Sequence, residues 1–280
     1  MNRQLYLECY SGISGDMTVA ALLDLGADEQ ILRKALASLP VGGFEIAVTR
    51  KVKSGLDVCD FDVILDAEHE NHDHDMEYLH GHDHQHTHDH EHVHEDGSVH
   101  THEHHHHDHS HEHHHDHGHH HEHRGLHEIL HIIEHADMTE RAKKTAVRIF
   151  QILAEAESKA HGVPADQVHF HEVGAVDSIV DILAVAVCLD NLDITEVIVP
   201  FLCEGQGSIR CQHGIIPVPV PAVVNIAQAH GLTLKPTGVQ GELVTPTGAA
   251  IVAAVRTSDK LPQTYRIVKI GMGAGKREYE

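Results

Sequence analysis

The sequence lacks the features that mark several common protein classes. It contains no tryptophan, and aromatic residues make up only 4% of its 280 positions. Its longest apolar run, 182–189, falls far short of the roughly 20 residues that cross a bilayer. The first ten residues, MNRQLYLECY, have no apolar stretch of the secretory type. We therefore expect a cytoplasmic protein that has no membrane-spanning segment.

Basic residues are also scarce, since 20 Lys and Arg stand against 43 Asp and Glu, for a formal net charge of −23. Such a chain repels nucleic acid phosphates and anionic lipid headgroups, so neither is an expected partner. Five cysteines without a CxxC pair argue against a zinc finger or a disulfide framework. The segment 271–276 is one residue short of a GxxxxGK[ST] phosphate loop, which disfavours a P-loop GTPase.

Histidine is what the sequence has in excess. Of its 35 histidines, 27 lie between His69 and His123, together with acidic residues and without any Lys or Arg. This composition cannot bury enough apolar surface to offset chain entropy, so we expect a disordered loop over 67–123. Residues 1–66 and 124–280 would then complete one globular domain of α/β or α+β class. We expect a mixed sheet with flanking helices, interrupted by the long His-rich loop.

Apolar periodicity and capping residues place the regular elements in the rest of the chain. The segment 205–221 carries several prolines and glycines, which predicts a stiff loop. Asp28 and Thr139 are candidate helix N-caps, and Ser54-Gly55 is a candidate hairpin turn. The expected helices are 17–26, 29–39, 126–133, 139–160, 177–189, 221–230 and 245–255; the expected strands are 5–10, 44–52, 57–65, 194–200, 232–236 and 264–271.

The His-rich loop predicts metal binding. Neutral imidazole suits Ni, Cu, Zn and Co, and the interspersed carboxylates add oxygen ligands. A solvated charged linker is the alternative, although such linkers are usually built from Ser, Gly, Glu or Lys. The densest candidate ligands are His104, His105, His106, His107, His113, His114 and His115.

A second candidate metal site is compact, within HFHEVGAVDSIVD at 169–181. In an extended chain, His169 and His171 point to the same side, and Glu172 follows them. Asp177 begins the next helix, with Asp181 one turn later on the same face. Two imidazoles and nearby carboxylates match a metal site with open positions. The alternative is that the histidines are turn residues and Asp177 is a helix cap.

Two turns rich in small residues enter helices and are candidate phosphate sites. Backbone N–H groups and the helix dipole favour anions there, and glycine permits close approach. Asp16 follows the first turn, where a carboxylate beside a phosphate makes sense if a cation bridges them. Tight turns with ordinary N-caps are the alternative. The candidate residues are Ser11, Gly12, Ser14 and Gly15 in the first turn, and Thr245, Thr247 and Gly248 in the second.

Taken together and in this order, these motifs resemble the LarC family of nickel insertion proteins. The resemblance rests on YLECYSGISGDM, the internal His-rich insertion, HFHEVGAVDSIVDI, GQGSIRCQHGIIPVPVPA, GELVTPTGAA and GMGAGKRE. It implies a lyase-class cyclometallase that inserts Ni²⁺ into a pyridinium bisthiocarboxylate mononucleotide, forming one Ni–C and two Ni–S bonds. The product is the nickel-pincer cofactor of lactate racemase.

The resemblance also implies CTP with Mg²⁺ or Mn²⁺, bound in a C-terminal domain that family members carry beyond the GMGAGKRE segment. That domain or its separate chain, lactate racemase and further copies of this chain are the expected partners. Because the reaction removes a ring proton, Asp16 or Glu172 is a candidate catalytic base. Two other hypotheses stay open: a nickel store or metallochaperone without chemistry, and a hydrolase that activates water at the His/carboxylate site.

Overall fold

A computed structural model describes residues 3–66, 92–93, 99–100, 125–168, 176–211 and 214–279. The described residues of 3–66 and 125–279 belong to one compact unit, and a second unit covers 75–122. In the second unit the described strands are β4 (His92–Val93) and β5 (Val99–His100), which pair antiparallel. The predicted disordered loop otherwise lies outside the described residues, and the domain boundaries stay a prediction.

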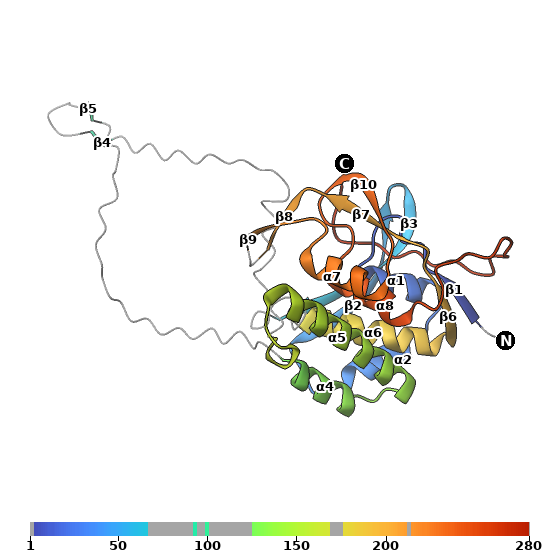
Figure 1. The fold of residues 1–280 in the computed structure, drawn as a ribbon. Helices are drawn as coiled ribbons and strands as arrows, with labels where there is room; N and C mark the ends of the chain where they lie inside the picture. The colour runs from blue at the N-terminus through green and yellow to red at the C-terminus, as the bar shows by residue number, and fades with distance from the viewer. Residues whose placement is uncertain are drawn as a thin grey trace. The chain divides into compact units, whose positions relative to one another are not determined.

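The helices lie close to the predicted positions, and two of them begin at the predicted capping residues. Asp28 accepts hydrogen bonds from the N–H groups of Gln30 and Ile31, and Thr139 accepts one from Ala142. Both expected N-caps are therefore confirmed. The α-helices of the main unit are α1 (Gly15–Asp24), α2 (Glu29–Ala37), α4 (Leu126–His135), α5 (Glu140–His161), α6 (Val176–Asn191), α7 (Pro221–His230) and α8 (Pro246–Val255), with a 3-10 turn η1 (Ala165–Gln167) (Figure 1).

Parallel and antiparallel strand pairs both occur, so the predicted mixture of directions is confirmed. They form separate two-stranded pieces in the described chain, where we expected one mixed sheet. The parallel pairs are β1 (Arg3–Tyr6) with β6 (Ile194–Ile198), and β7 (Leu202–Gln206) with β10 (Leu234–Gln240). The antiparallel pairs are β2 (Phe44–Lys53) with β3 (Leu56–Leu65), and β8 (Ser208–Cys211) with β9 (Gly214–Pro217).

Two predictions about strands were wrong. The stiff loop expected at 205–221 contains the β8–β9 pair, which is possible because Pro217 ends β9 and the other prolines follow it. The strand expected at 264–271 is absent, and Tyr265, Ile267 and Val268 are exposed there. Its β-branched residues favour a strand only when a neighbouring strand can pair with them.

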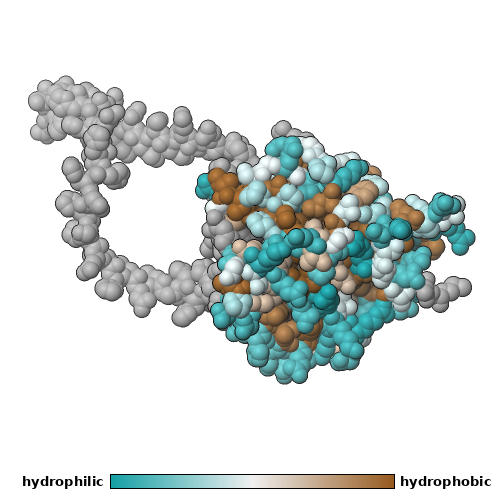
Figure 2. Space-filling model, in the orientation of Figure 1, coloured by the Kyte–Doolittle hydropathy of each residue, from teal (hydrophilic) through white to brown (hydrophobic). Residues whose placement is uncertain are grey.

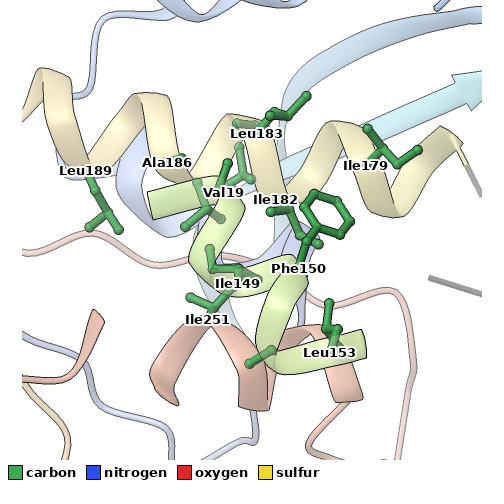
Figure 3. Close-up of a cluster of buried hydrophobic side chains, with 14 of the residues drawn as sticks. Val19, Ile149, Phe150, Leu153, Ile179, Ile182, Leu183, Ala186, Leu189 and Ile251 are labelled. Carbon is green, nitrogen blue, oxygen red and sulfur yellow. The ribbon is translucent and has the colours of Figure 1, made fainter. Parts of the chain in front are cut away.

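The hydrophobic core is organised around α6, which explains its continuous apolar run. This helix packs against α1, α2 and α5, so it buries 11 of its 16 residues. Figure 3 shows Ile182 and Leu183 of α6 near Val19 of α1 and Phe150 of α5. A rigid helix at the centre of the core gives the polar residues of its first two turns a fixed position.

The surface is mixed in character on the side shown in Figure 2, where hydrophilic residues surround separate hydrophobic patches. Within the described part of the chain, no helix combines the length and the hydropathy that a membrane span requires. This agrees with the short apolar runs in the sequence.

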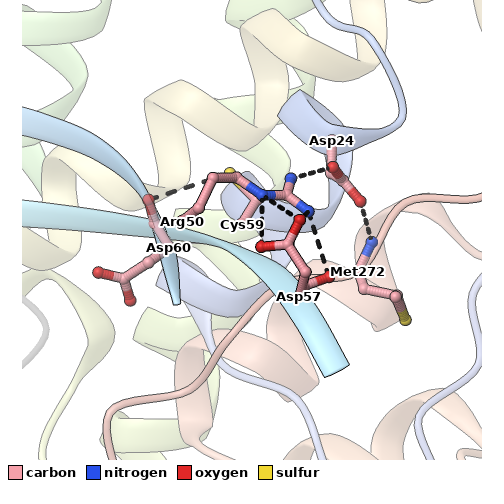
Figure 4. Close-up of polar contacts among 6 residues, drawn as sticks. All are labelled: Asp24, Arg50, Asp57, Cys59, Asp60 and Met272. Carbon is pink, nitrogen blue, oxygen red and sulfur yellow. Dashed lines mark hydrogen bonds and ion pairs between the residues drawn. The ribbon is translucent and has the colours of Figure 1, made fainter. Parts of the chain in front are cut away.

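A network of charged side chains around Arg50 connects the C-terminal segment, at Met272, to the rest of the fold (Figure 4). Arg50 of β2 pairs with Asp24 at the end of α1 and, at 2.9 Å, with Asp57 of β3. The second oxygen of Asp24 accepts the N–H of Met272 at 2.8 Å. Partial burial alone would raise the pKa of Asp24, but the bonds from Met272 and Arg50 lower it overall. The carboxylate therefore connects α1, the hairpin and the C-terminal segment.

Replacing Asp24 by asparagine is expected to lower the free energy of unfolding by about 0.2–1 kcal/mol at pH 7, because the substitution removes the ion pair with Arg50. Because the pKa of Asp24 is lowered in the folded state, the carboxylate stabilises the fold above the ordinary carboxyl pKa of ~4. This contribution is lost as pH falls from that value through the lower pKa of the folded state. Urea unfolding at pH 7 and pH 3.5 should show the difference shrinking at the lower pH. A difference that is equal at both values would contradict the assignment.

Candidate functional site

The two predicted turns meet in the structure. The Ile13 N–H donates to Leu243 O at 2.9 Å, and the Thr245 N–H donates to Ile13 O at 3.0 Å. Ile13 and Val244 thereby form a parallel bridge. The entrances to α1 and α8 consequently lie side by side, although they are at opposite ends of the chain.

Glycine is required where the turns touch. A Cβ on Gly12 would lie 2.0 Å from Leu243 O, and one on Gly248 would lie 2.2 Å from Ile13 O. The space beside both glycines is therefore filled by backbone from the opposite turn. Thr245 caps α8 by accepting the Gly248 N–H at 3.1 Å, in line with the alternative that we left open. A phosphate site at these turns stays a prediction.

Acidic side chains gather at the start of α1. The Ser14 hydroxyl donates to Asp16 Oδ1 and the Asp16 N–H bonds to the carboxylate of Asp181 on α6. A Cβ on Gly15 would lie 2.5 Å from Asp181 Oδ2, so this glycine lets the helix entrance approach the acid. Burial, and then the charges of Asp16 and Asp177, raise the pKa of Asp181 well above its usual range. Among the described residues, Oδ1 of Asp181 has no hydrogen-bond partner.

Lys276 supplies positive charge beside these acids. Its Nζ lies 2.7 Å from Asp62 Oδ1 of β3. Burial alone would lower the pKa of Lys276, but Asp62, Asp16 and Asp181 raise it overall, so the ammonium stays charged. A cation from the C-terminal segment thus lies beside the two turns and the acids.

Close packing explains the glycines that precede this lysine. A Cβ on Gly271 would lie 2.3 Å from Ala21 O, and one on Gly273 would lie 2.0 Å from Met17 O, both on α1. The segment 271–277, which we call the C-terminal strap, therefore lies directly on that helix. Its glycines carry Lys276 to the site by fitting against α1, and this packing accounts for a glycine pattern that resembles a phosphate loop in sequence.

The predicted metal ligands are only partly visible. Asp177 is half-buried in the first turn of α6, one turn before Asp181, as the sequence indicated. His169, His171 and Glu172 lie outside the described residues, as do the candidate ligands at 104–107 and 113–115. Within the described ranges, no three His, Cys, Asp or Glu side chains are grouped closely enough to hold a metal ion. The metal roles therefore stay predictions.

A buried glutamate fixes the second turn. Glu204 of β7 is 1% exposed, and its Oε1 accepts the N–H groups of Leu243 and Gly205 at 2.8 Å and of Val244 at 3.1 Å. Burial raises the pKa of Glu204, while these three bonds and the charge of Arg277 oppose the rise. One carboxylate oxygen thus holds the backbone that leads into α8.

Sequence reasoning missed three residues of this arrangement. Asp181 carried a signal, its spacing of four from Asp177, but it was not chosen as a site residue. The sequence presents Lys276 only as the last residue of an incomplete phosphate loop, which does not indicate a role beside acids. Glu204 had no detectable signal, because nothing in its local sequence reveals that it bonds to a turn 40 residues away.

Comparison with known proteins places this chain in a family. The family described as nickel insertion protein matches residues 5–280. Proteins called pyridinium-3,5-bisthiocarboxylic acid mononucleotide nickel insertion protein are 50% identical in Alkaliphilus metalliredigens, 42% in Clostridium acetobutylicum and 38% in Geobacillus kaustophilus. These matches cover 98–99% of this chain and 56–61% of each relative, so the chain spans under two thirds of their length. No solved structure matches it. The resemblance seen in the sequence is confirmed: the chain belongs to the nickel insertion protein family.

Proposed function

We propose that this chain takes part in inserting nickel into pyridinium-3,5-bisthiocarboxylic acid mononucleotide, which yields the nickel-pincer cofactor of lactate racemase. The names of its relatives support this reaction. The structural observation that carries it is the meeting of the α1 and α8 entrances beside Asp16, Asp181 and Lys276. A phosphate anchor, a proton acceptor and a balancing cation would then share one region.

The substrate's phosphate is proposed to bind at the paired turns. Ser11 is exposed at the edge of the first turn, and the start of each helix favours an anion through its dipole. The ligand set is Ser11, Gly12, Ser14 and Gly15 with Thr245, Thr247 and Gly248. Because Gly12 and Gly248 are packed against backbone, their part is to bring the two helix entrances together so that both dipoles act on one anion.

Nickel is the cargo of this reaction. We propose that the histidines of 67–123, including those at 104–107 and 113–115, collect Ni²⁺ and pass it to His169, His171, Glu172 and Asp177. Imidazole is a preferred ligand of Ni²⁺, whereas carboxylates alone suit harder ions. Since the described acids do not group closely enough to hold a metal by themselves, the two imidazoles are essential to this scheme.

Forming a Ni–C bond breaks a ring C–H bond, and the proton must move to a base. We propose that one carboxylate of the pair Asp16 and Asp181 accepts it; Asp181 accepts the Asp16 backbone N–H, which holds the two acids together. A carboxyl whose pKa is raised by burial and by neighbouring acids, as in Asp181, takes up a proton more readily than an ordinary carboxyl. Lys276 would offset the negative charge that the acids carry before the proton arrives. Glu172 is the second candidate for this role.

The finer features of the activity are also proposals. A lyase-class cyclometallase reaction would use CTP with Mg²⁺ or Mn²⁺, which we assign to the C-terminal domain or its separate chain. That domain, lactate racemase and further copies of this chain in a homo-oligomer are the proposed partners. The shared coverage of under two thirds of each relative is consistent with this division of the machinery.

Replacing Asp181 by asparagine is expected to slow cofactor formation about 100-fold or more, because general acid–base catalysis typically contributes roughly 10²- to 10⁴-fold. The assay supplies the C-terminal domain, CTP, Mg²⁺ and Ni²⁺, and it measures the nickel-bound product. The variant should be more stable by about 0.5–2 kcal/mol at pH 7, because an amide is neutral and avoids the cost of burying a carboxylate beside other acids. This measurement separates a chemical defect from unfolding.

The exposed Asp166 on η1 offers a matched control, and Asp166→Asn should leave the rate unchanged. If Asp181→Asn formed cofactor at the wild-type rate, Asp181 would have no part in the proton transfer. If the wild type bound nickel but formed no cofactor with all components present, the chain would be a nickel store, and the proposed reaction would be wrong.

A further inference from the structure

An aromatic pair, an exposed Tyr10 and a half-buried Phe201, lies beside the first turn. The rings of Tyr10 and Phe201 are stacked, with centroids 5.3 Å apart and planes inclined by 10°. Tyr10 is 54% exposed, in a chain whose aromatic residues comprise only five Phe and five Tyr. An aromatic ring that is held parallel to another ring, yet open to solvent, offers a flat face to a ligand.

Strand pairing explains why these rings share one face. Cys9 forms a parallel bridge with Leu202, and both side chains are buried. Because side chains alternate along extended backbone, the neighbouring Tyr10 and Phe201 point to the opposite, outer side. Lys235 of β10 joins them, with its Nζ 5.0 Å from the centroid of the Phe201 ring. The outer face therefore presents two stacked rings and one cation.

The Tyr10 ring is fixed before any ligand arrives. Its side chain hydrogen-bonds that of Tyr6, and Tyr6 meets Tyr265 edge-on with ring centroids 6.4 Å apart. Together with the Phe201 stack, these contacts hold Tyr10 from two directions. A ring that is already oriented loses little conformational freedom on binding.

The substrate's chemistry matches this surface. A pyridinium ring is an aromatic cation, which is attracted to the π-face of a tyrosine. Its thiocarboxylate groups are anionic, and Lys235 is the cation beside the rings. Tyr10 is followed at once by Ser11 and Gly12, where the phosphate of the same molecule is proposed to bind. The ring and the phosphate would meet complementary groups at successive residues, and Lys235 of β10, over the Phe201 ring, would supply a cation for the acid groups.

We propose that the Tyr10–Phe201 stack, with Lys235, is the binding platform for the pyridinium ring of the mononucleotide substrate. This rests on the proposed function, since it takes the same substrate. It assigns the ring to a place that neither the turns nor the acidic cluster provides, and it makes Tyr10 a determinant of affinity for an aromatic cation.

Binding of the mononucleotide, measured by calorimetry on the full chain, tests this assignment. Tyr10→Ala should weaken the Kd about 3- to 30-fold, the range expected for losing a cation–π contact, whereas Tyr10→Phe keeps the ring and should bind like the wild type. Ribose 5-phosphate, which lacks the ring, should bind Tyr10→Ala and the wild type equally. Leu56→Ala is the control, because Leu56 is a 55% exposed apolar residue of β3 that has no part in the stack, and its removal should leave the Kd unchanged.

The absence of tryptophan offers a direct spectroscopic readout. In Tyr10→Trp the new indole is the only one in the chain, and a pyridinium ring stacked on it should quench its fluorescence. Quenching by the mononucleotide, and none by ribose 5-phosphate, would support the platform. Quenching by CTP and not by the mononucleotide would overturn it in favour of a nucleobase site.

The two proposals fail in different ways. If the wild type does not bind the mononucleotide at all, the proposed function is wrong. If the wild type binds it and Tyr10→Ala binds it equally well, the platform is wrong while the proposed function stands. An equal loss of mononucleotide and ribose 5-phosphate binding in Tyr10→Ala would also overturn the platform, because the defect would not depend on the ring.

Discussion

Replacing Gly12 by alanine is expected to lower the free energy of unfolding by about 2–5 kcal/mol. Gly12 has φ +82°, where a side chain costs about 1–2 kcal/mol. In addition, its Cβ would lie 2.0 Å from Leu243 O, and overpacking of this kind costs a further ~1–3 kcal/mol. Because the contact is with backbone, the two turns must move apart, and the proposed phosphate site would be lost with the stability.

Gly55 provides a matched control for this substitution. Its φ of +79° is nearly the same, but no heavy atom lies within 4 Å of the position of its Cβ. Gly55→Ala should therefore show only the conformational cost of about 1–2 kcal/mol. Urea unfolding of both variants isolates the contribution of the contact between the turns. Equal losses in the two variants would mean that the close approach at Gly12 does not stabilise the fold.

Glu204→Ala is expected to lower the free energy of unfolding by about 3–5 kcal/mol. Removing one partner from a buried charged interaction typically has an effect of this size. The substitution leaves three backbone N–H groups without their acceptor in a region closed to water. Two of them belong to Leu243 and Val244, which precede α8. The turn that meets Ile13 should consequently loosen, and the loss should appear in the unfolding free energy from urea denaturation.

Glu204→Gln separates the hydrogen bonds from the charge. Its amide oxygen still accepts, so the loss at pH 7 should be well below that of the alanine variant. Since burial raises the pKa of Glu204, the wild type loses stability as pH rises through the folded pKa, and the glutamine variant does not. The free energy of unfolding of Glu204→Gln should therefore rise relative to that of the wild type between pH 4 and pH 8. Glu45→Ala, an exposed glutamate of β2, should change stability little, and an equal loss there would refute the role of Glu204.

The helices could be predicted from the sequence because their information is local. Asp28 and Thr139 cap the helices that follow them, and the apolar spacing marks the buried faces. The segment 264–271 shows the limit of such reasoning. Its β-branched and aromatic residues are typical of a strand, but the decisive factor, a neighbouring strand with free backbone groups, is a property of the whole fold.

The candidate site was predictable in its parts and not in its assembly. The turns at 11–15 and 245–248 are visible as clusters of small residues. Their contact through Ile13 and Leu243, however, joins distant segments, and no local pattern encodes it. The partnership of Asp181 with the Asp16 backbone depends equally on how α1 crosses α6. Glu204 and Lys276 likewise belong to the site through contacts with residues that are distant in the sequence.

The C-terminal strap carries two neighbouring cations that pair with different acids. Lys276 faces Asp62 and the acids near α1, while Arg277 pairs with Glu242 at 3.0 Å, beside the turn that leads to α8. The strap carries no strand ladder of its own and depends on Asp24, Cys59 and its glycines for position. A shift of this single peptide stretch would thus unbalance the charge on both helix entrances at once, which makes their electrostatics one linked quantity.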